Sequence, residues 1–279
     1  TEMLADIRNR AVIRAGFERH RPEVVFHAAA HKHVPLLEDH PCEAVETNVL
    51  GTANVIDAAT AVDVRHFVFI STDKAVHPSS VMGASKQLGE QVLLARRPAG
   101  GRWCAVRFGN VVGSRGSVIP TFARQIASGG PVTVTDARMT RFFMSIEEAV
   151  QLVLQAASFA DGGEVFMLDM GEPVNILQLA RRMIRLSGYT EAEVPIRISG
   201  VRPGEKLTEE LRAPGENAWP TPHPGIVGLY PLILPRAELD EGIDSLRGAV
   251  DERADGDARR LLLGLVRRAP APADDPRAV

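Results

Sequence analysis

HFVFIST (66–72) is a short apolar run that ends in small polar residues, and the prediction of the fold starts from it. β-Branched and aromatic residues in a run of this length are typical of a buried β-strand. The stretch that follows, MGASKQLGEQVLLARR (82–97), has apolar residues close to helical spacing. A strand followed by a helix is half of a crossover unit, which joins neighbouring parallel strands.

The same alternation continues on both sides of this segment. Residues 42–60 have apolar side chains close to helical spacing. Three further runs have the composition of buried strands: EVVFHAAA (23–30), WCAVRFGNVVG (103–113) and EVFMLDMG (164–171). Short apolar strands separated by helices predict an α/β fold with a Rossmann-like, doubly wound parallel sheet.

The later part of the chain has a more mixed pattern. Ser145 and Glu148 form a capping box at the start of a predicted helix. The Pro-rich stretch 213–225 predicts a loop, and residues 268–279 predict a disordered tail. The other expected elements are helices at 120–130, 145–158 and 175–188, a strand at 194–200 and two helices within 236–267.

The composition excludes several classes of protein. A net charge of -3 argues against a nucleic-acid-binding protein, which normally carries a basic excess. Cys42 and Cys104 form no spacing motif, which fits a reducing compartment better than a disulfide scaffold. No apolar run reaches the length of a membrane span, and no signal peptide is recognisable. These features together predict a cytoplasmic chain.

One motif that the fold normally contains is missing. Doubly wound folds usually open with a strand, a glycine-rich turn and a helix that holds a pyrophosphate. Nothing before VVFHAAA (24–30) matches that pattern, and GSRGSVIP (113–120) follows a late strand and precedes a proline. Because the chain also begins with Thr1, we expect the first strand, Gly-loop and helix to be missing by N-terminal truncation.

Thr72, Asp73 and Lys74 are the first candidates for catalysis, because they follow a predicted strand of the parallel sheet. Ligands gather at the carboxyl ends of such strands. An adjacent acid and base can exchange protons with neighbouring atoms of a substrate, although an ordinary lysine keeps its proton up to about pH 10. The alternative is a polar turn with a solvated lysine, and these residues alone leave it open.

Six motifs give the chain a specific resemblance from about residue 4 to about residue 267. It resembles the extended short-chain dehydrogenase/reductase superfamily and, within it, the polysaccharide-biosynthesis UDP-N-acetylglucosamine 4,6-dehydratases. Many members of that superfamily have a tyrosine four residues before a lysine that binds the nicotinamide ribose. Here the lysine is Lys86 and the earlier position is Met82, which resembles the larger, usually membrane-anchored branch. The motifs are FHAAAHKHVPLLE, TNVLGT, STDKAVHPSSVMGASK, RFGNVVGSRGSVIP, MTRFFM and RPGEKLTEEL.

The resemblance implies a nucleotide-sugar dehydratase that uses NAD. NAD oxidises sugar C4, water is eliminated across C5 and C6, and the hydride returns to C6. It implies that Lys74 is the base at C5, that Asp73 is the acid at C6 and that Thr72 hydrogen-bonds the C4 oxygen. Lys86 is expected to bind the nicotinamide ribose. Without a tyrosine, Thr72 or Asp73 is our hypothesis for the group that relays the C4 proton.

The resemblance also implies binding residues, each with a simpler structural explanation. Asp6 and Ile7 are expected beside the adenine, and Asn48 behind the catalytic centre. Ala28, Ala29 and Ala30 follow a strand, where small side chains allow NAD to approach, although tight packing explains them equally well. Surface ion pairing is the ordinary alternative for the charged residues. The candidates for the UDP-sugar are Lys32, Asn110, Arg115, Arg141, Arg202 and Glu205.

Four histidines lie close together in the sequence, at positions 27, 31, 33 and 40. Histidine is a common metal ligand, but this spacing matches no finger or helical metal motif. The resembled family uses no metal at this place. We therefore expect no metal and interpret these residues as loop histidines near the cofactor.

The resemblance also predicts how the chain is organised. Residues 1–171 are expected to form an incomplete NAD-binding Rossmann domain, and 119–140 to contribute to a substrate lobe. Residues 172–267 are expected to form that smaller C-terminal lobe. A homo-oligomer is expected through the helices at 42–60 and 82–97. The parent protein is expected to be anchored in a membrane by segments outside this chain, with a cytoplasmic catalytic domain.

Three other functions stay open at this stage. A UDP-sugar 4-epimerase needs NAD and a C4 base, but it does not need the acid–base pair. A dehydratase that inverts C5 would have the same sequence features. A non-catalytic structural or partner-binding remnant would explain the missing Gly-loop, although Asp73, Lys74 and Lys86 argue that its parent was an enzyme.

Overall fold

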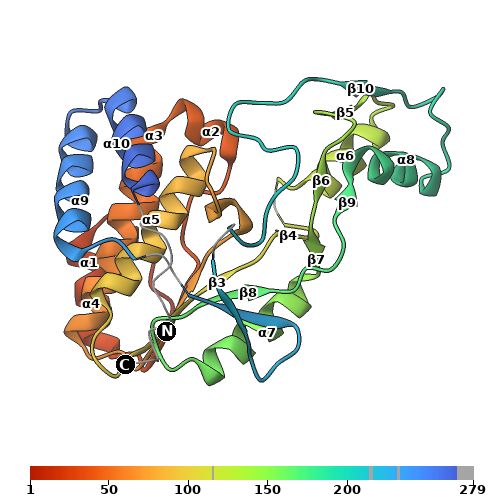
Figure 1. Cartoon of the computed structure of the whole chain (residues 1–279). Helices are drawn as coiled ribbons and strands as arrows, with labels where there is room; N and C mark the ends of the chain where they lie inside the picture. The colour runs from red at the N-terminus through yellow and green to blue at the C-terminus, as the bar shows by residue number, and fades with distance from the viewer. Residues whose placement is uncertain (115, 214–215, 231–232, 269–279) are drawn as a thin grey trace.

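The protein is built around a six-stranded sheet in a computed structural model, which describes residues 1–114, 116–213, 216–230 and 233–268. The first four strands in spatial order are parallel and the last two are antiparallel (Figure 1). This arrangement confirms the predicted α/β fold with a parallel sheet. The order is β1 (Val24–His27), β2 (His66–Ile70), β3 (Arg102–Arg107), β8 (Val165–Leu168), β12 (Ile226–Leu229) and β11 (Ala218–Pro220).

The central strands are apolar because helices cover both faces of the sheet. Phe67, Val68 and Phe69 of β2 are fully buried. Phe67 and Phe69 pack into one core, whereas Val68 packs into the core on the opposite face. The covering elements are α1 (Arg10–His20), α2 (Val34–Asp39), α3 (Pro41–Ala44), a π-helical segment η1 (Val45–Gly51), α4 (Thr52–Ala61) and α5 (Val81–Arg96) on the first face, and α7 (Ile146–Phe159) on the second.

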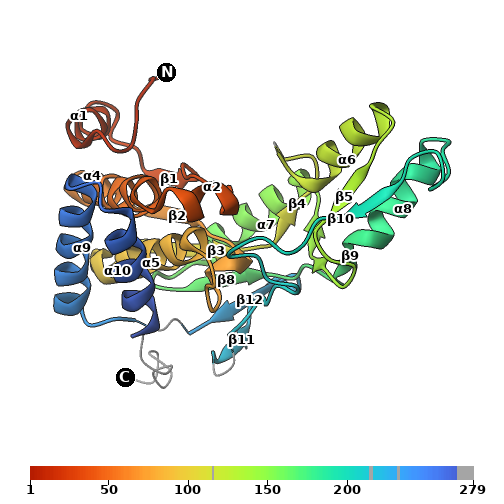
Figure 2. The ribbon, with the colours of Figure 1, turned by 90° about the horizontal axis from the view of Figure 1, so that it is seen from above.

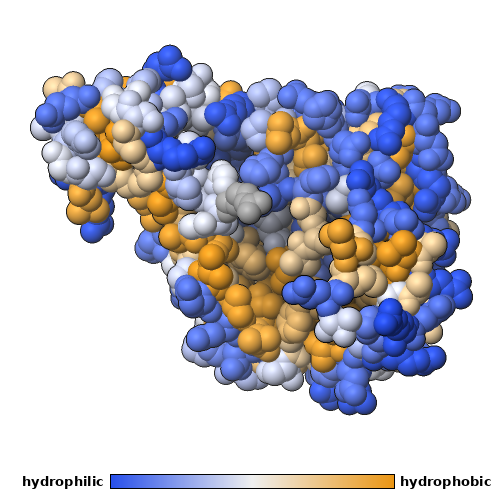
Figure 3. All heavy atoms as spheres, turned by 180° about the vertical axis from the view of Figure 1, so that it is seen from behind, coloured by the Kyte–Doolittle hydropathy of each residue, from blue (hydrophilic) through white to orange (hydrophobic). Residues whose placement is uncertain are grey.

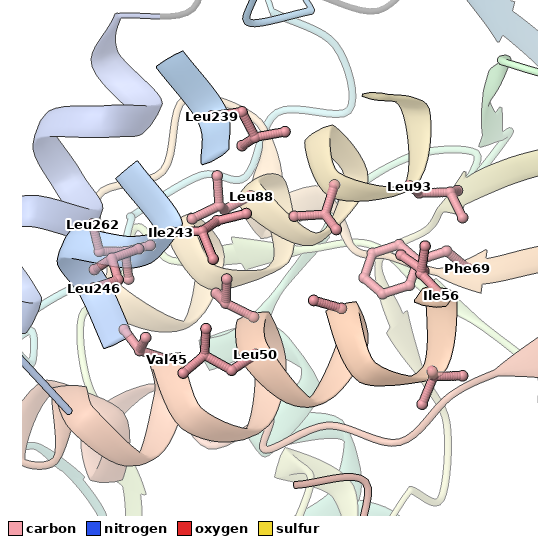
Figure 4. Close-up of a cluster of buried hydrophobic side chains, with 14 of the residues drawn as sticks. Val45, Leu50, Ile56, Phe69, Leu88, Leu93, Leu239, Ile243, Leu246 and Leu262 are labelled. Carbon is pink, nitrogen blue, oxygen red and sulfur yellow. The ribbon is translucent and has the colours of Figure 1, made fainter. Parts of the chain in front are cut away.

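Two C-terminal helices, α9 (Arg236–Asp251) and α10 (Asp255–Arg267), cover the helices of the first face. Figure 4 shows Ile243 and Leu246 of α9 beside Leu88 of α5 and Leu50 of η1. This differs from the prediction that the whole of 172–267 forms a substrate lobe. The reason is the amphipathic pattern of both helices, whose apolar stripes complete the main core.

Helix α5 is buried along most of its length. Every residue from Val81 to Leu94 is buried, because η1, α4, α9 and α10 surround the helix. Only the end of the helix, at Ala95 and Arg96, and the adjoining Arg97 are half-buried, and the expected association through 82–97 stays a prediction.

A second, smaller lobe lies to one side of the sheet (Figures 1 and 2). It has its own core, which contains Phe122, Val132, Ile176 and Val194. A short pairing of β4 (Asn110–Val111) with β7 (Phe143–Met144) joins the lobe to the sheet. The lobe consists of α6 (Val118–Ala127), β5 (Val132–Val134), β6 (Thr140–Arg141), β9 (Val174–Asn175), α8 (Ile176–Leu186) and β10 (Ile196–Ile198).

The predicted loop at 213–225 is wrong in part, because it contains strand β11 (Ala218–Pro220). Proline cannot donate a backbone hydrogen bond, so it is confined to sheet edges. Strand β11 is an edge strand of the main sheet, which makes Pro220 acceptable there. The next strand, β12, was not expected from the sequence, because four residues are too few to show an alternating pattern.

The opposite edge of the sheet is strand β1, and its side chains are partly open to solvent. Val24 and Phe26 expose 47% and 45% of their surface, and Figure 3 shows apolar area on the rear of the molecule.

Within the described residues, none of the helices combines the length and apolar character that a membrane crossing requires.

Two Gly→Ala substitutions in helices should have opposite effects on stability. A Cβ at Gly83 in α5 would overlap the Lys74 carbonyl oxygen and meet Pro78 at 3.2 Å, so G83A should destabilise the fold by about 1–3 kcal/mol. Gly248 in α9 is exposed with nothing within 4 Å of such a Cβ, so G248A should stabilise it by about 0.5–1 kcal/mol. Urea unfolding measures both, and equal effects would contradict the close approach at Gly83.

Candidate active site

A cleft of about 520 Å³ lies where the carboxyl ends of β1, β2 and β3 face the small lobe. This is the position that parallel sheets offer to ligands. The cleft brings together most of the residues that the sequence suggested. Those that line it are Ala28, Ala30, Lys32, Thr72, Lys74, Met82, Lys86, Asn110, Arg141, Arg202 and Glu205.

The turn after β2 is held in place by its own polar groups. Thr72 caps a short 3-10 helix (Asp73–Ala75), and its Oγ1 accepts a hydrogen bond of 3.3 Å from the Lys74 backbone N–H. The Thr72 hydroxyl also donates to Asp73 Oδ1 at 2.9 Å. The backbone N–H of Asp73 donates to the Phe108 carbonyl at 3.0 Å, which ties the turn to the end of β3.

Asp73 and Lys74 form a direct acid–base pair. Lys74 Nζ donates to Asp73 Oδ1 at 2.9 Å and to Asn110 Oδ1 at 3.3 Å. The Asp73 side chain is fully buried, and its Oδ2 has no hydrogen-bond partner among the described residues. Lys74 keeps 18% of its side chain exposed, toward the cleft. A proton can therefore pass between the two side chains without solvent.

Helix α5 places Met82 and Lys86 one turn apart on the cleft. Lys86 Nζ lies 3.9 Å from the centre of the Phe69 ring, and burial lowers the pKa of Lys86 to about 7 while Glu90 raises it. Burial and the neighbouring Lys86 also lower the pKa of His27 to about 3. Neither of the two tyrosines of the chain lines the cleft in the described residues.

Asn48 lies behind the cleft in the π-helical segment η1. Its side chain accepts from the His31 backbone N–H at 2.8 Å and donates to the His31 carbonyl at 2.9 Å. It also donates to Ser85 Oγ at 2.9 Å. Asn48 therefore fixes the loop after β1 against helix α5, and single π-turns are often found at such functional positions.

The side of the cleft that faces the small lobe is lined by cations. Arg141 is buried, and its Nη1 donates to the carbonyls of Thr140 at 2.7 Å and Leu207 at 3.3 Å. Lys32 and Arg202 are exposed at the cleft, and the Arg202 backbone N–H donates to Glu205 Oε2 at 3.2 Å. Arg115, the remaining predicted substrate residue, lies outside the described residues.

Other predicted residues do not line the cleft. Asp6 is exposed and pairs with Arg8, whose hydrogen bonds lower the pKa of Asp6 to about 2. Ile7 packs on the main core next to Gly51. Ala29 is exposed and does not line the cleft, although Ala28 and Ala30 on either side of it do.

The structure adds residues that sequence reasoning missed. Ser71 lines the cleft, and Glu209 lies 3.8 Å from Lys74 Nζ. His31 and His33, which the sequence suggested as loop histidines near a cofactor, line the cleft as well. Glu209 belongs to the RPGEKLTEEL motif, but its sequence position gave no reason to choose it over Glu210. In the part of the chain that the structure describes, no group of three or more His, Cys, Asp or Glu side chains could hold a metal ion.

Comparison with known proteins identifies the family. A family model described as "Polysaccharide biosynthesis protein" matches residues 1–231. The chain belongs to this polysaccharide biosynthesis family. It is an extended short-chain dehydrogenase/reductase by sequence and fold, as the resemblance predicted.

Three relatives of this polysaccharide biosynthesis chain are informative. It is 56% identical over 75% of its length to the capsular polysaccharide biosynthesis protein CapD of Staphylococcus aureus. It is 49% identical over 83% to the probable polysaccharide biosynthesis protein EpsC of Bacillus subtilis. It spans only 35% and 40% of these two proteins. It is also 40% identical over 77% to a UDP-glucose 4-epimerase of Rickettsia massiliae, and it spans 62% of that protein.

Solved structures show the same fold. Pen from Bacillus thuringiensis is 38% identical, with a TM-score of 0.75 over 81% of this chain and 70% of that one. A dTDP-glucose 4,6-dehydratase from Streptomyces venezuelae, solved with NAD bound, is 21% identical, with a TM-score of 0.67 over 74% of this chain and 69% of that one. At that identity the second likeness concerns the fold alone.

The low pKa of Lys86 predicts a pH-dependent contribution to stability. Between pH 7 and 10.5 the unfolded chain binds a proton at this lysine that the folded chain does not bind. Burial of Lys86 therefore lowers the free energy of unfolding below pH 10.5. This loss becomes smaller as the pH rises through that window, so the free energy of unfolding increases. The stability of the wild type relative to K86M should increase from about pH 7 to about pH 9 in urea unfolding. A difference independent of pH would contradict the buried, neutralised state of Lys86.

Proposed function

We propose that this chain is the catalytic part of an NAD-dependent nucleotide-sugar 4,6-dehydratase, a lyase of surface polysaccharide biosynthesis that acts on UDP-N-acetylglucosamine. The observation that carries the proposal is the direct hydrogen bond from Lys74, which lines the cleft, to the buried carboxylate of Asp73. No tyrosine lines this cleft among the described residues. An adjacent acid and base suit an elimination across two neighbouring carbons. Because the chain spans 35–40% of its first curated relatives, the activity is proposed for the whole protein.

The residues at the ends of β1 and β2 fit NAD. Ala28 and Ala30 line the cleft with small side chains, and Lys86 lines it too, with its Nζ without a hydrogen-bond partner among the described residues. Such a group is available for the ribose hydroxyls of a dinucleotide. When bound, NAD would accept a hydride from C4 and would later give it back at C6.

The acid–base pair can move both protons of the elimination. Transfer of one proton from Lys74 to Asp73 along their 2.9 Å hydrogen bond gives a neutral amine and a protonated carboxyl group. The amine then takes the C5 proton, while the carboxyl group gives its proton to the C6 hydroxyl, which leaves as water. The pair ends the elimination as ammonium and carboxylate. When the hydride returns to C6, the Lys74 ammonium gives its proton to C5, and Lys74 regains a proton from solvent, which balances the proton that the C4 hydroxyl released on oxidation. Thr72, which hydrogen-bonds Asp73 and lines the cleft, is proposed to contact the C4 oxygen.

The proposed diphosphate contacts are Lys32, Arg141 and Arg202. Guanidinium groups bind phosphate through parallel hydrogen bonds, and all three side chains line the cleft. Glu205 is proposed to accept from a ribose hydroxyl, and Asn110 to orient the sugar near Lys74. A cytoplasmic location is part of the proposal, since both cysteines are buried and unpaired, as expected in a reducing compartment.

Proton NMR of the whole protein with NAD and UDP-N-acetylglucosamine tests the reaction. The expected product is a 4-keto-6-deoxy sugar, seen as a new methyl doublet, with deuterium at C5 when the reaction runs in D2O. Without the acid or the base, D73N and K74M should each lose at least about 100-fold in turnover. D251N, at the exposed end of α9, is the control and should keep full activity. A folded K74M variant with unchanged turnover would exclude this mechanism.

A 4-epimerase is the second candidate, because of the 40% identity to a curated UDP-glucose 4-epimerase. An epimerase would invert C4 and keep the C6 oxygen, so the same NMR spectrum would show a C4 epimer and no methyl doublet. The substitution of Met82 for a tyrosine in the cleft favours the dehydratase.

A further inference from the structure

A carboxylate outside the catalytic turn binds the first backbone N–H of helix α5. Glu38 lies on the short helix α2, at the end of the motif FHAAAHKHVPLLE, and its Oε1 accepts from the Val81 backbone N–H at 2.6 Å. The first N–H groups of a helix have no partner within the helix, so Glu38 supplies one that the backbone lacks. A negative charge at a helix N-terminus is also favoured by the helix dipole.

The Glu38 side chain is almost completely enclosed. Only 7% of it is exposed, and its Oε2 accepts from Arg259 Nη2 of α10 at 3.3 Å. The preceding residue, Leu37, is buried in the main core, which holds this end of α2 in place. Each carboxylate oxygen therefore has a donor, and these two contacts compensate the burial of the charge.

The third neighbour of this carboxylate is the loop 201–206. Gly204 has a φ of +77°, and a Cβ on it would lie 2.9 Å from Glu38 Oε1 and 2.9 Å from Ser80 Cβ. The Ser79 hydroxyl donates to the Gly204 carbonyl at 3.1 Å. The backbone of the loop therefore lies directly against the carboxylate and the start of α5, and glycine is the residue that allows this approach.

Glu38 thus lies where three segments that line the cleft meet. Residues 30–33 line it just before α2, and Lys86 lines it from α5. Arg202 and Glu205 line it from the loop. Glu38 itself is not among the described residues that line the cleft, so its effect on a bound ligand passes through these segments.

We propose that Glu38 is a positioning residue for the reaction: its carboxylate fixes the N-terminus of α5, and with it Lys86, against the loop 201–206. The side of the cleft proposed for NAD and the side proposed for UDP are thereby held at one separation. Hydride transfer depends on that separation, because a displacement of about 1 Å can cost about 100-fold in rate. The catalytic consequence rests on the proposed dehydratase function, whereas the contact and its effect on NAD binding do not.

Hydrogen exchange of the Val81 amide tests the contact. Loss of the acceptor in E38A should make this amide exchange at least about tenfold faster. E38Q keeps an acceptor oxygen and should recover most of the protection. The matched control is S145A, which removes the hydroxyl that accepts from the Glu148 N–H at the start of α7 and should leave Val81 unchanged. An unchanged Val81 amide in folded E38A would overturn the inference.

Kinetics of the whole protein separate positioning from simple stabilisation. E38A should lower kcat by about 10- to 100-fold and weaken NAD binding, and E38Q should recover most of both. S145A loses a comparable cap on a helix whose residues do not line the cleft, so it should keep the wild-type kcat and NAD affinity. Equal losses of kcat in E38A and S145A would mean general destabilisation and would overturn the proposal.

Gly204→Ala tests the same contact from the side of the loop. G204A should lower kcat in the wild type, because its Cβ would displace the carboxylate, and should have a smaller effect in E38A, where that space is free. The same loss in both backgrounds would contradict the contact. If E38A speeds Val81 exchange and weakens NAD binding, but the wild type forms no 4-keto-6-deoxy sugar, the proposed function fails and the positioning of α5 stands.

Discussion

The burial of strand β2 on both faces is the constraint on which the site depends. Its central side chains reach two different cores, so the strand cannot shift or rotate without disrupting both. The chain leaves the strand at Ile70 and enters the turn that contains Thr72, Asp73 and Lys74. The hydrogen bond from Asp73 N to the Phe108 carbonyl then joins this turn to the end of β3. Precise placement of the acid–base pair is therefore a consequence of core packing.

A buried ionic network lies next to the turn that contains Thr72, Asp73 and Lys74. Arg107 of β3 makes two hydrogen bonds to Glu90 of α5 and two to Glu216, and all three side chains are buried. Burial lowers the pKa of Arg107, but the two carboxylates outweigh it, so this pKa lies above its usual range. Ser71 donates to Glu90, which connects the network to the residue just before Thr72. Removal of one partner would leave a buried charge uncompensated, which is strongly destabilising.

The two lysines of the cleft show how environment separates chemical roles. Lys86 lies on a helix surrounded by apolar side chains, and Phe69 is its nearest ring, so burial favours its neutral form. Lys74 lies on a turn between two carboxylates, and its Nζ is 2.9 Å from Asp73 Oδ1 and 3.8 Å from Glu209 Oε1. The small lobe thus contributes to the chemistry as well as to the walls of the cleft, because the loop that follows it brings Glu209 to Lys74.

The sequence by itself determined the parallel sheet and the helices with clear caps, because both follow from local spacing. The acid and base roles proposed for Asp73 and Lys74 came from the family resemblance, since the two residues alone also fit a polar turn. Short strands such as β11 and β12 were beyond the sequence alone, since two to four residues carry no period. The sequence also could not show that α9 and α10 return to cover α5, or that Glu209 rather than Glu210 reaches Lys74. Those outcomes depend on which apolar faces remain uncovered after the sheet has formed, and only the tertiary structure decides them.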